Sequence, residues 1–267
     1  MADLQQAIQF VQTNGTAVDL ARLAFLRHHQ PAPPAIVAEL AANQREDGGF
    51  APFWAADYSS LDATCYRLAQ VEQVGIPANM PFVQRALVHL AARQQADGRF
   101  HEDPLIAASA PPWAKPGDLA ATLYLTANCG FWLALWGDEP EPALDAAHFL
   151  KRHLAADGRF PSFLHTHWLA AGLWLQMGNT AVYETVCHTL HRQLDQLSAG
   201  NLAWMATTLL AAGAEADHPL IHAAAERLDK LQQPDGRWPG DDGEWQDVHT
   251  TLEALRVLVS RERTEIG

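Results

Sequence analysis

One short motif occurs four times in this chain and constrains its fold more than any other feature. Each copy contains an Asp-Gly dipeptide, one further residue and an aromatic residue, as in QREDGGF, QQADGRF, LAADGRF and QQPDGRW. The copies lie at residues 44–50, 94–100, 154–160 and 232–238. Asp-Gly favours a tight turn, because glycine tolerates a positive φ and aspartate can bond its own downstream amides. Since each copy ends one amphipathic segment and precedes a more apolar one, the sequence predicts a repeated helical hairpin.

Hydrophobic periodicity predicts an all-helical chain. The expected helices cover residues 3–12, 16–27, 35–43, 59–74, 81–95, 117–136, 140–154, 164–177, 180–197, 201–212, 218–232 and 247–259. The expected corner glycines are Gly15, Gly48, Gly98, Gly158, Gly200 and Gly236, of which Gly15 and Gly200 stand in degenerate corners. Long loops, including a proline-rich one at residues 101–116, make the period uneven.

The polarity of the two helices in each pair indicates how the pairs assemble. The helix before each corner is the more polar one, and the helix after it is apolar almost all round, which is typical of a helix buried on both sides. Six such hairpins close naturally into a ring, whereas an open superhelix would expose the apolar inner faces. The sequence therefore predicts a single all-α domain over residues 1–267, an α6–α6 toroid with an inner and an outer ring of helices.

Composition limits the range of partners. The chain has 18 basic and 31 acidic residues and a net charge of −13, which argues against a nucleic-acid surface. Its three cysteines, Cys65, Cys129 and Cys187, are too few and too scattered for a disulfide framework or a paired zinc knuckle. No signal-peptide pattern follows Met1, so a cytoplasmic location is expected. The longest apolar run, residues 119–136, is predicted to be a buried helix rather than a transmembrane segment. A homo-oligomer is compatible with the sequence.

The repeated corner resembles the repeat of the squalene–hopene cyclase and protein prenyltransferase superfamily. The helices that follow the corners carry a similar signature, with DAT at residues 62–64, DLAAT at 118–122 and DVHT at 247–250. The resemblance covers most of the chain and implies an α/α toroid. It is less specific for the reaction, because the motif residues mostly join helices and the Asp-x-Asp-Asp acid motif of the cyclases is absent.

The common corner also predicts where chemistry is located. All the inner helices follow the same kind of corner, so they are expected to run parallel, with their N-termini around one mouth of the barrel. Acids, histidines and aromatic rings from distant parts of the chain then meet in a concave site. The candidate catalytic residues are Asp62, Asp118, His167, His249 and Asp247. The candidate substrate-binding residues are Trp54, Tyr58, Trp113, Trp168, Trp204 and Trp245.

Each of these residue types also has a structural explanation. Asp62, Asp118 and Asp247 stand where helix N-caps are expected. A helix N-terminus favours the charged form of a carboxyl, so a general acid at such a position needs burial or a neighbouring carboxylate. Histidines such as His165, His167 and His249 are more often hydrogen-bonded structural groups than ligands. Aromatic residues on buried helices usually belong to the core.

Several functions remain open. In terpenoid cyclase-like chemistry, a carboxylic acid protonates an alkene and aromatic faces stabilise the carbocation. A zinc site like that of the protein prenyltransferases would use Asp62, Cys65 and His249, although two residues rather than one separate Asp62 from Cys65. Helical toroids also host glycoside hydrolases and polysaccharide lyases, which pair two carboxylates with stacked rings. The remaining alternative is a non-catalytic binding or scaffold protein.

The favoured hypothesis combines the fold with the first of these chemistries. The barrel is expected to bind a small hydrophobic molecule of isoprenoid type and to cyclise or isomerise it by acid–base chemistry. Asp62 or Asp118 is the expected acid, and His167 or His249 the proton partner. The sequence requires no cofactor, and zinc enters only with the prenyltransferase-like alternative. Neither a nucleic acid nor a transmembrane segment is expected.

Overall fold

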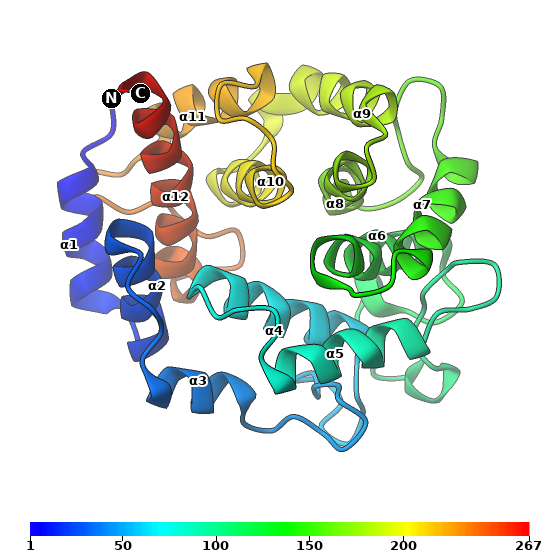
Figure 1. Ribbon diagram of the computed structural model, residues 1–267. Helices are drawn as coiled ribbons and strands as arrows, with labels where there is room; N and C mark the ends of the chain where they lie inside the picture. Colours follow the sequence, from blue (N-terminus) through cyan, green and yellow to red (C-terminus); the bar gives the residue numbers. More distant parts are fainter. Residues whose placement is uncertain (267) are drawn as a thin grey trace. The chain divides into compact units, whose positions relative to one another are not determined.

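The computed structural model describes residues 1–266, with side chains up to residue 262. Within that range the chain is all-helical and contains no strand (Figure 1). The α-helices are α1 (Leu4–Asn14), α2 (Ala17–His28), α3 (Pro34–Ala41), α4 (Leu61–Gln73), α5 (Pro81–Ala92), α6 (Leu119–Trp136), α7 (Glu141–His153), α8 (Leu164–Gln176), α9 (Thr180–Gln193), α10 (Ala199–Ala211), α11 (Pro219–Leu231) and α12 (Asp247–Ile266). Short 3-10 helices are η1 (Pro104–Ile106), η2 (Pro112–Ala114), η3 (Leu194–Gln196) and η4 (Glu244–Gln246). Every predicted helix is present, which confirms the all-helical fold.

The chain forms two compact units. Unit 1 contains Met1–Ile36, Gln73–Gly75 and the chain from Cys187 onward, and there α12 contacts α1, α2, α10 and α11. Unit 2 contains Val37–Glu72 and Ile76–Val186, and there α6 contacts α5, α7 and α8. By length and composition, α6 is the one helix in the described chain that could cross a membrane, and 67% of it is buried inside the protein.

Helices α4, α6 and α8 of unit 2 run in the same direction, and so do α10 and α12 of unit 1. These are inner helices of the predicted hairpins. In unit 2, Ser162 before α8 donates to the Ala120 carbonyl at the start of α6, with Oγ and O 2.7 Å apart. Asp62 in the first turn of α4 contacts Tyr124 in the first half of α6. In unit 1, the Ser198 N-cap of α10 contacts Asp241 in the loop that leads into α12. Each of these pairs places the two helix starts at the same end.

The four clear corners share one backbone conformation. Their glycines have φ values of 86°, 89°, 83° and 91° at Gly48, Gly98, Gly158 and Gly236. In the second corner, Gly98 N donates to Gln95 O at 2.9 Å and Gln95 N donates to Arg99 O at 3.0 Å. The same two bonds recur at equivalent positions in the other three corners. The predicted Asp-Gly turn is therefore confirmed at all four places.

The aromatic residue of each corner connects it to the next inner helix. Phe50, Phe100, Phe160 and Trp238 are all buried. The backbone N–H of Phe100 donates to Thr126 Oγ1 at 2.9 Å, and that of Trp238 donates to Thr251 Oγ1 at 3.0 Å. Phe50 uses Thr64 in the same way, and Phe160 uses His167. One side chain per inner helix therefore satisfies a buried N–H that would otherwise be costly.

The glutamine that opens three of the corners joins each corner to the following outer helix. Gln94 Nε2 donates to Gly98 O at 3.1 Å and to Pro142 O in α7 at 2.8 Å. Gln44 makes the matching bonds to Gly48 and to Phe82 in α5. Gln232 bonds Gly236 and Asp3, the N-cap of α1. The third corner has Leu154 at this position, which offers no such donor.

The two degenerate corners differ from the prediction. Gly15 has φ −78°, so it ends α1 in extended backbone rather than in a left-handed turn. Thr16 follows directly and starts α2 with a capping box to Asp19, which leaves no room for a corner. Gly200 lies inside the first turn of α10, because Ser198 caps that helix through Asn201 N. Neither glycine forms the repeated turn.

Candidate active site

The best-formed polar site surrounds Asp62 in unit 2. Asp62 Oδ2 accepts a hydrogen bond from Trp113 Nε1 at 3.0 Å, and Oδ1 accepts one from the Tyr124 hydroxyl at 3.0 Å. Asn128, one turn further along α6, donates to the Tyr124 oxygen at 3.4 Å. Trp113 comes from η2, and Tyr124 is buried within α6. The carboxyl is thus held by one side chain from a loop and one from a helix.

Burial controls the acidity of Asp62. It raises the pKa of this carboxyl above its ordinary value of 3.8, and the hydrogen bonds from Trp113 and Tyr124 offset only part of that effect. The residue as a whole keeps some exposed surface. The two donors nevertheless enclose its carboxyl. Burial also raises the pKa of Tyr124 well above its usual range, so this phenol remains a hydrogen-bond donor. Burial therefore makes this carboxyl hold its proton more strongly than a carboxyl in water does, and the two donors are in place to stabilise its anion.

A second carboxyl, which the sequence analysis did not identify, lies close by. Glu102 is fully buried and accepts from Ser60 Oγ at 2.6 Å, from the Tyr58 hydroxyl at 2.9 Å and from Asp62 N at 3.3 Å. Burial raises the pKa of Glu102 against these hydrogen bonds, which lower it. Tyr58 also accepts from Arg93. The available sequence signal was its position two residues after the buried corner aromatic Phe100.

Two cysteines lie further along the same helices. The sulfurs of Cys65 and Cys129 are 3.8 Å apart, and both residues are buried. Burial raises the pKa of Cys65, as do the neighbouring Cys129 and Asp62. A protonated, buried thiol is a poor metal ligand and a poor nucleophile. These two cysteines therefore contribute to the core between α4 and α6.

In unit 1, His249 belongs to a buried ionic cluster. Arg22 on α2 contacts His249 Nδ1 at 3.1 Å and donates to Glu253 Oε1 at 2.8 Å. Thr207 on α10 donates to the other Glu253 oxygen at 2.7 Å. Burial and the Arg22 charge lower the pKa of His249 to about 4. Burial acts to raise the pKa of Glu253, but Arg22, Arg256 and His249 together lower it below its usual value.

The other two candidate aspartates accept hydrogen bonds from backbone N–H groups. Asp118 is exposed and caps α6 by accepting from Ala121 N at 2.9 Å. Asp247 is buried and accepts from Arg237 Nη1 and from Gly240 N, each at 2.8 Å. Asp118 therefore stabilises a helix start, and Asp247 fixes the loop between Trp238 and α12.

His167 has both ring nitrogens engaged. Its Nε2 accepts from Phe160 N at 3.1 Å, which places the proton on Nδ1 facing Leu164 O at 3.1 Å. Burial lowers its pKa, which favours the neutral ring that accepts through Nε2. This histidine performs in the third corner the role that a threonine performs in the others.

The candidate tryptophans differ widely in exposure. Trp168 is completely buried beside His165, with ring centroids 5.0 Å apart. Trp245 is 76% exposed in η4 of unit 1, and its Nε1 donates to Asp242 O. Trp54 and Trp204 are half-buried, in unit 2 and unit 1 respectively. Trp113, which donates to Asp62, brings a predicted substrate-binding ring into contact with a candidate acid.

The zinc candidates fall in different units. Asp62 and Cys65 belong to unit 2, and His249 belongs to unit 1. Over the described residues, no group of three or more His, Cys, Asp or Glu side chains is arranged to hold a metal ion.

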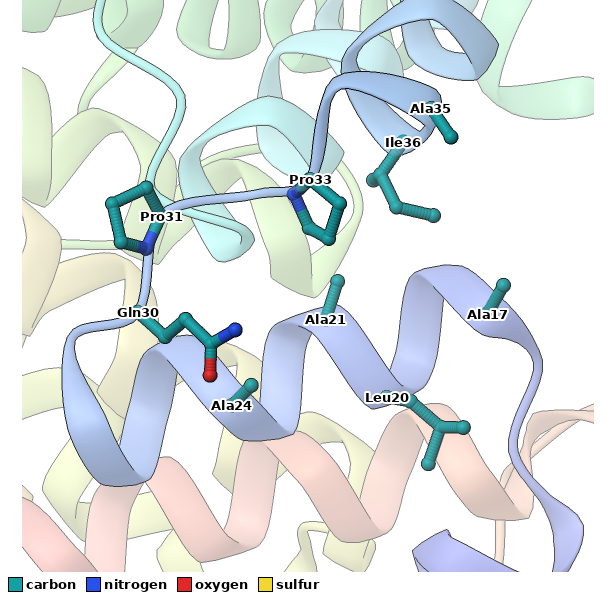
Figure 2. Close-up of a pocket in the computed structure, with 9 residues that line it drawn as sticks. All are labelled: Ala17, Leu20, Ala21, Ala24, Gln30, Pro31, Pro33, Ala35 and Ile36. Atoms are coloured by element: carbon teal, nitrogen blue, oxygen red, sulfur yellow. The ribbon is translucent and has the colours of Figure 1, made fainter.

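Unit 1 also contains an apolar groove. It has a volume of about 350 Å³ and runs between α2 and the segment that leads into α3 (Figure 2). Its lining residues are Ala17, Leu20, Ala21, Ala24, Gln30, Pro31, Pro33, Ala35 and Ile36. Because Gln30 is its only polar side chain, the groove has no group for acid–base chemistry.

Comparison with known proteins shows a likeness to terpene cyclases. No protein-family model matches it. The drimenyl diphosphate synthase of Streptomyces showdoensis is 25% identical over 244 residues, which are 89% of this chain and 38% of that protein. The chain therefore spans well under half the length of this curated relative. The type II terpene cyclase MstE from Scytonema matches 97% of this chain with 97% of its own, with a TM-score of 0.60 and 17% identity. The resemblance to the terpene cyclase-like superfamily is confirmed.

Two further solved structures share this terpene cyclase-like fold. A variant of MstE in complex with its substrate, geranylgeranyl dihydroxybenzoate, covers 92% of this chain with 87% of its own, at a TM-score of 0.59 and 17% identity. A protein from Actinoplanes covers 92% of this chain with 89% of its own, at a TM-score of 0.58 and 18% identity. At these identities the likeness concerns the fold.

Proposed function

We propose that this chain is a terpene cyclase-like enzyme in which Asp62 protonates an alkene of a linear isoprenoid. The observation that carries the proposal is the enclosed Asp62 carboxyl, held by Trp113 and Tyr124. An alkene is a weak base, so its protonation needs a carboxyl that is protonated at rest and whose anion is stabilised after transfer. Burial favours the first condition, and the two hydrogen-bond donors favour the second.

The proposed reaction conserves all atoms of the substrate. Asp62 gives its proton to one alkene carbon, and the resulting carbocation is attacked by the next alkene to form a ring bond. The final cation loses a proton to a base, so the product is an isomer of the substrate. The electron-rich face of Trp113 is suited to stabilising a cation beside the acid. Asp118 and His167 have no role in this scheme, because the first is an exposed cap and the second has both nitrogens engaged.

The relatives support a hydrophobic, isoprenoid-type ligand. MstE is described with a geranylgeranyl substrate, and the curated relative is a diphosphate synthase of the drimenyl type. We also propose that the two units together form the single α6–α6 toroid over residues 1–267. Parallel inner helices within each unit and the match to MstE over 97% of the chain support this arrangement. Small-angle scattering that excludes a closed ring would overturn it.

The activity is tested by incubating the purified protein with farnesyl diphosphate, geranylgeranyl diphosphate and geranylgeranyl dihydroxybenzoate. Cyclisation is expected to give a product of unchanged mass with fewer alkene signals in the NMR spectrum. In D₂O the product should gain one deuterium, because the proton on Asp62 exchanges with solvent before it is transferred. Absence of any isomeric product from all three substrates counts against the proposal.

Replacement of the acid gives the decisive variant. Asp62→Asn keeps the size of the side chain but removes its transferable proton, so turnover is expected to fall about 100- to 10,000-fold. Asp118→Asn is the matched control, since asparagine is also a good N-cap and turnover should change little. Circular dichroism verifies that both variants fold. Full activity in Asp62→Asn would remove this residue from the mechanism.

A further inference from the structure

We infer that Glu102 is a positioning residue that fixes the first turn of α4 and with it the Asp62 carboxyl. The inference rests on the proposed function and deepens it, because it assigns a second residue to the same site. Glu102 comes from the loop between α5 and α6, yet its carboxylate lies at the N-terminus of α4. It is completely buried. Its hydrogen bonds are separate from those that Trp113 and Tyr124 make to Asp62.

Glu102 holds the capping group of α4. Ser60 Oγ accepts from Ala63 N at 3.2 Å, which caps the helix, and donates its own proton to Glu102 Oε1 at 2.6 Å. The same Glu102 oxygen accepts from Asp62 N at 3.3 Å. One carboxylate oxygen therefore fixes both the cap and the backbone of the proposed acid. A carboxylate at a helix N-terminus is also favoured by the helix dipole.

The second Glu102 oxygen connects this turn to the surrounding loops. It accepts from the Tyr58 hydroxyl at 2.9 Å. The Tyr58 oxygen in turn accepts from Arg93 Nη2 at 2.6 Å and from Asp103 N at 2.9 Å, so its only proton points to Glu102. Glu102 thus connects the start of α4 to the loop that carries Trp113, one of the two donors to Asp62.

The geometry requires a carboxylate rather than an amide at this position. The groups around the Glu102 oxygens are all donors, namely the Tyr58 and Ser60 hydroxyls and the backbone N–H groups of Leu61 and Asp62. In Glu102→Gln, the new NH₂ group would face either Tyr58, whose oxygen already accepts two bonds, or Asp62 N–H. Either orientation leaves a buried donor without an acceptor. The change is therefore expected to loosen the first turn of α4 although the side-chain volume is unchanged.

The test combines hydrogen exchange with turnover in the full-length protein. Glu102→Gln is expected to accelerate amide exchange at residues 61–64 about 5- to 30-fold, which is the factor that corresponds to the loss of a helix cap. Turnover should fall about 10- to 100-fold with little change in KM, because a small displacement of a catalytic group costs rate rather than binding. Glu139→Gln is the matched control, since it makes the same change in a side chain that is exposed between α6 and α7.

The outcomes separate this inference from the proposed function. Unchanged exchange at residues 61–64 in Glu102→Gln overturns it, and so does faster exchange with undiminished turnover. If the natural protein converts none of the three isoprenoids, the proposed function fails, and the exchange measurement alone decides whether Glu102 fixes the turn. If Glu102→Gln does not fold, Tyr58→Phe removes one of the donors to Glu102, together with the oxygen that accepts from Arg93 and from Asp103 N. It should then show the same changes at smaller size, and the absence of these changes overturns the inference.

Discussion

At the scale of single residues, the charge states of buried side chains depend on partners that are distant in sequence. His249 and Glu253 lie on α12, and Arg22, which contacts both, lies on α2. The sequence predicted His249 as a candidate from its neighbours in the helix signature. It did not predict Arg22, because that contact depends on the register between two helices that lie more than two hundred residues apart in the chain. For the same reason, Glu102 could not be placed at the start of α4.

This buried histidine predicts an acid-sensitive fold. The pKa of His249 is about 4 in the folded protein, and a histidine in an unfolded chain titrates near 6.5. The unfolded state therefore binds more protons between these values, so stability falls as the pH drops through this window. We expect about 3 kcal/mol of unfolding free energy to be lost there through His249. The lowered pKa of Glu253 adds a further loss at still lower pH.

Urea titrations at several pH values between 7 and 4 measure this loss. His249→Gln should be less stable than the natural protein at pH 7 but should lose less stability on acidification. An identical pH profile in the variant would show that His249 is not the group responsible.

At the scale of elements, the corner motif was the most predictable feature of the molecule. Four Asp-Gly corners were read from the sequence, because a left-handed glycine and a buried aromatic are local properties. Gly15 and Gly200 were misassigned because helix caps at Thr16 and Ser198 satisfy those helix starts without a corner. The sequence also did not show that the corner glutamines bind the next hairpin, since their acceptors are backbone carbonyls.

The corner glycines are predicted to be required for two separate reasons. Gly98 has φ 89°, and an added Cβ would stand 2.3 Å from Asp145 O in α7. Gly178 has φ 71° with nothing within 4 Å of an added Cβ. Gly178→Ala should therefore cost only the conformational strain, about 1–2 kcal/mol. Gly98→Ala adds the steric clash and should cost about 2–5 kcal/mol. Equal losses of unfolding free energy in the two variants, measured by thermal or urea unfolding, would show that the close approach of Gly98 to α7 does not affect stability.

At the scale of the whole molecule, Ala2 near the start of the chain and Arg261 in the last described turns of α12 both bind α11. Asp229 on that helix accepts from Ala2 N and from Arg261 Nη1, each at 2.9 Å. Gln6 Nε2 also donates to Pro234 O at 2.7 Å, so α1 packs on the last corner. Figure 1 shows the two termini in this part of unit 1. The sequence predicted the helices, the repeat and the superfamily resemblance. It did not predict these contacts with α11 and the last corner, because the side chains that make them belong to no local sequence motif.

The position of the termini predicts that the chain tolerates circular permutation. A short Gly-Ser linker between the two ends of this chain, with new ends at the exposed Asp138, leaves all the corner contacts in place. The permuted protein is expected to have the same circular dichroism and a single cooperative unfolding transition. A permuted chain that unfolds in two separate transitions, while the natural one unfolds in one, would contradict this expectation.

The corner glutamines affect how far the amino-acid sequence can change while the fold is kept. Gln44, Gln94 and Gln232 bind main-chain oxygens of their own corner and of the following outer helix. Every amino acid carries that oxygen, so mutations on the receiving helix leave the attachment intact. Descendants of such a chain are then free to replace most of their side chains while keeping the same architecture.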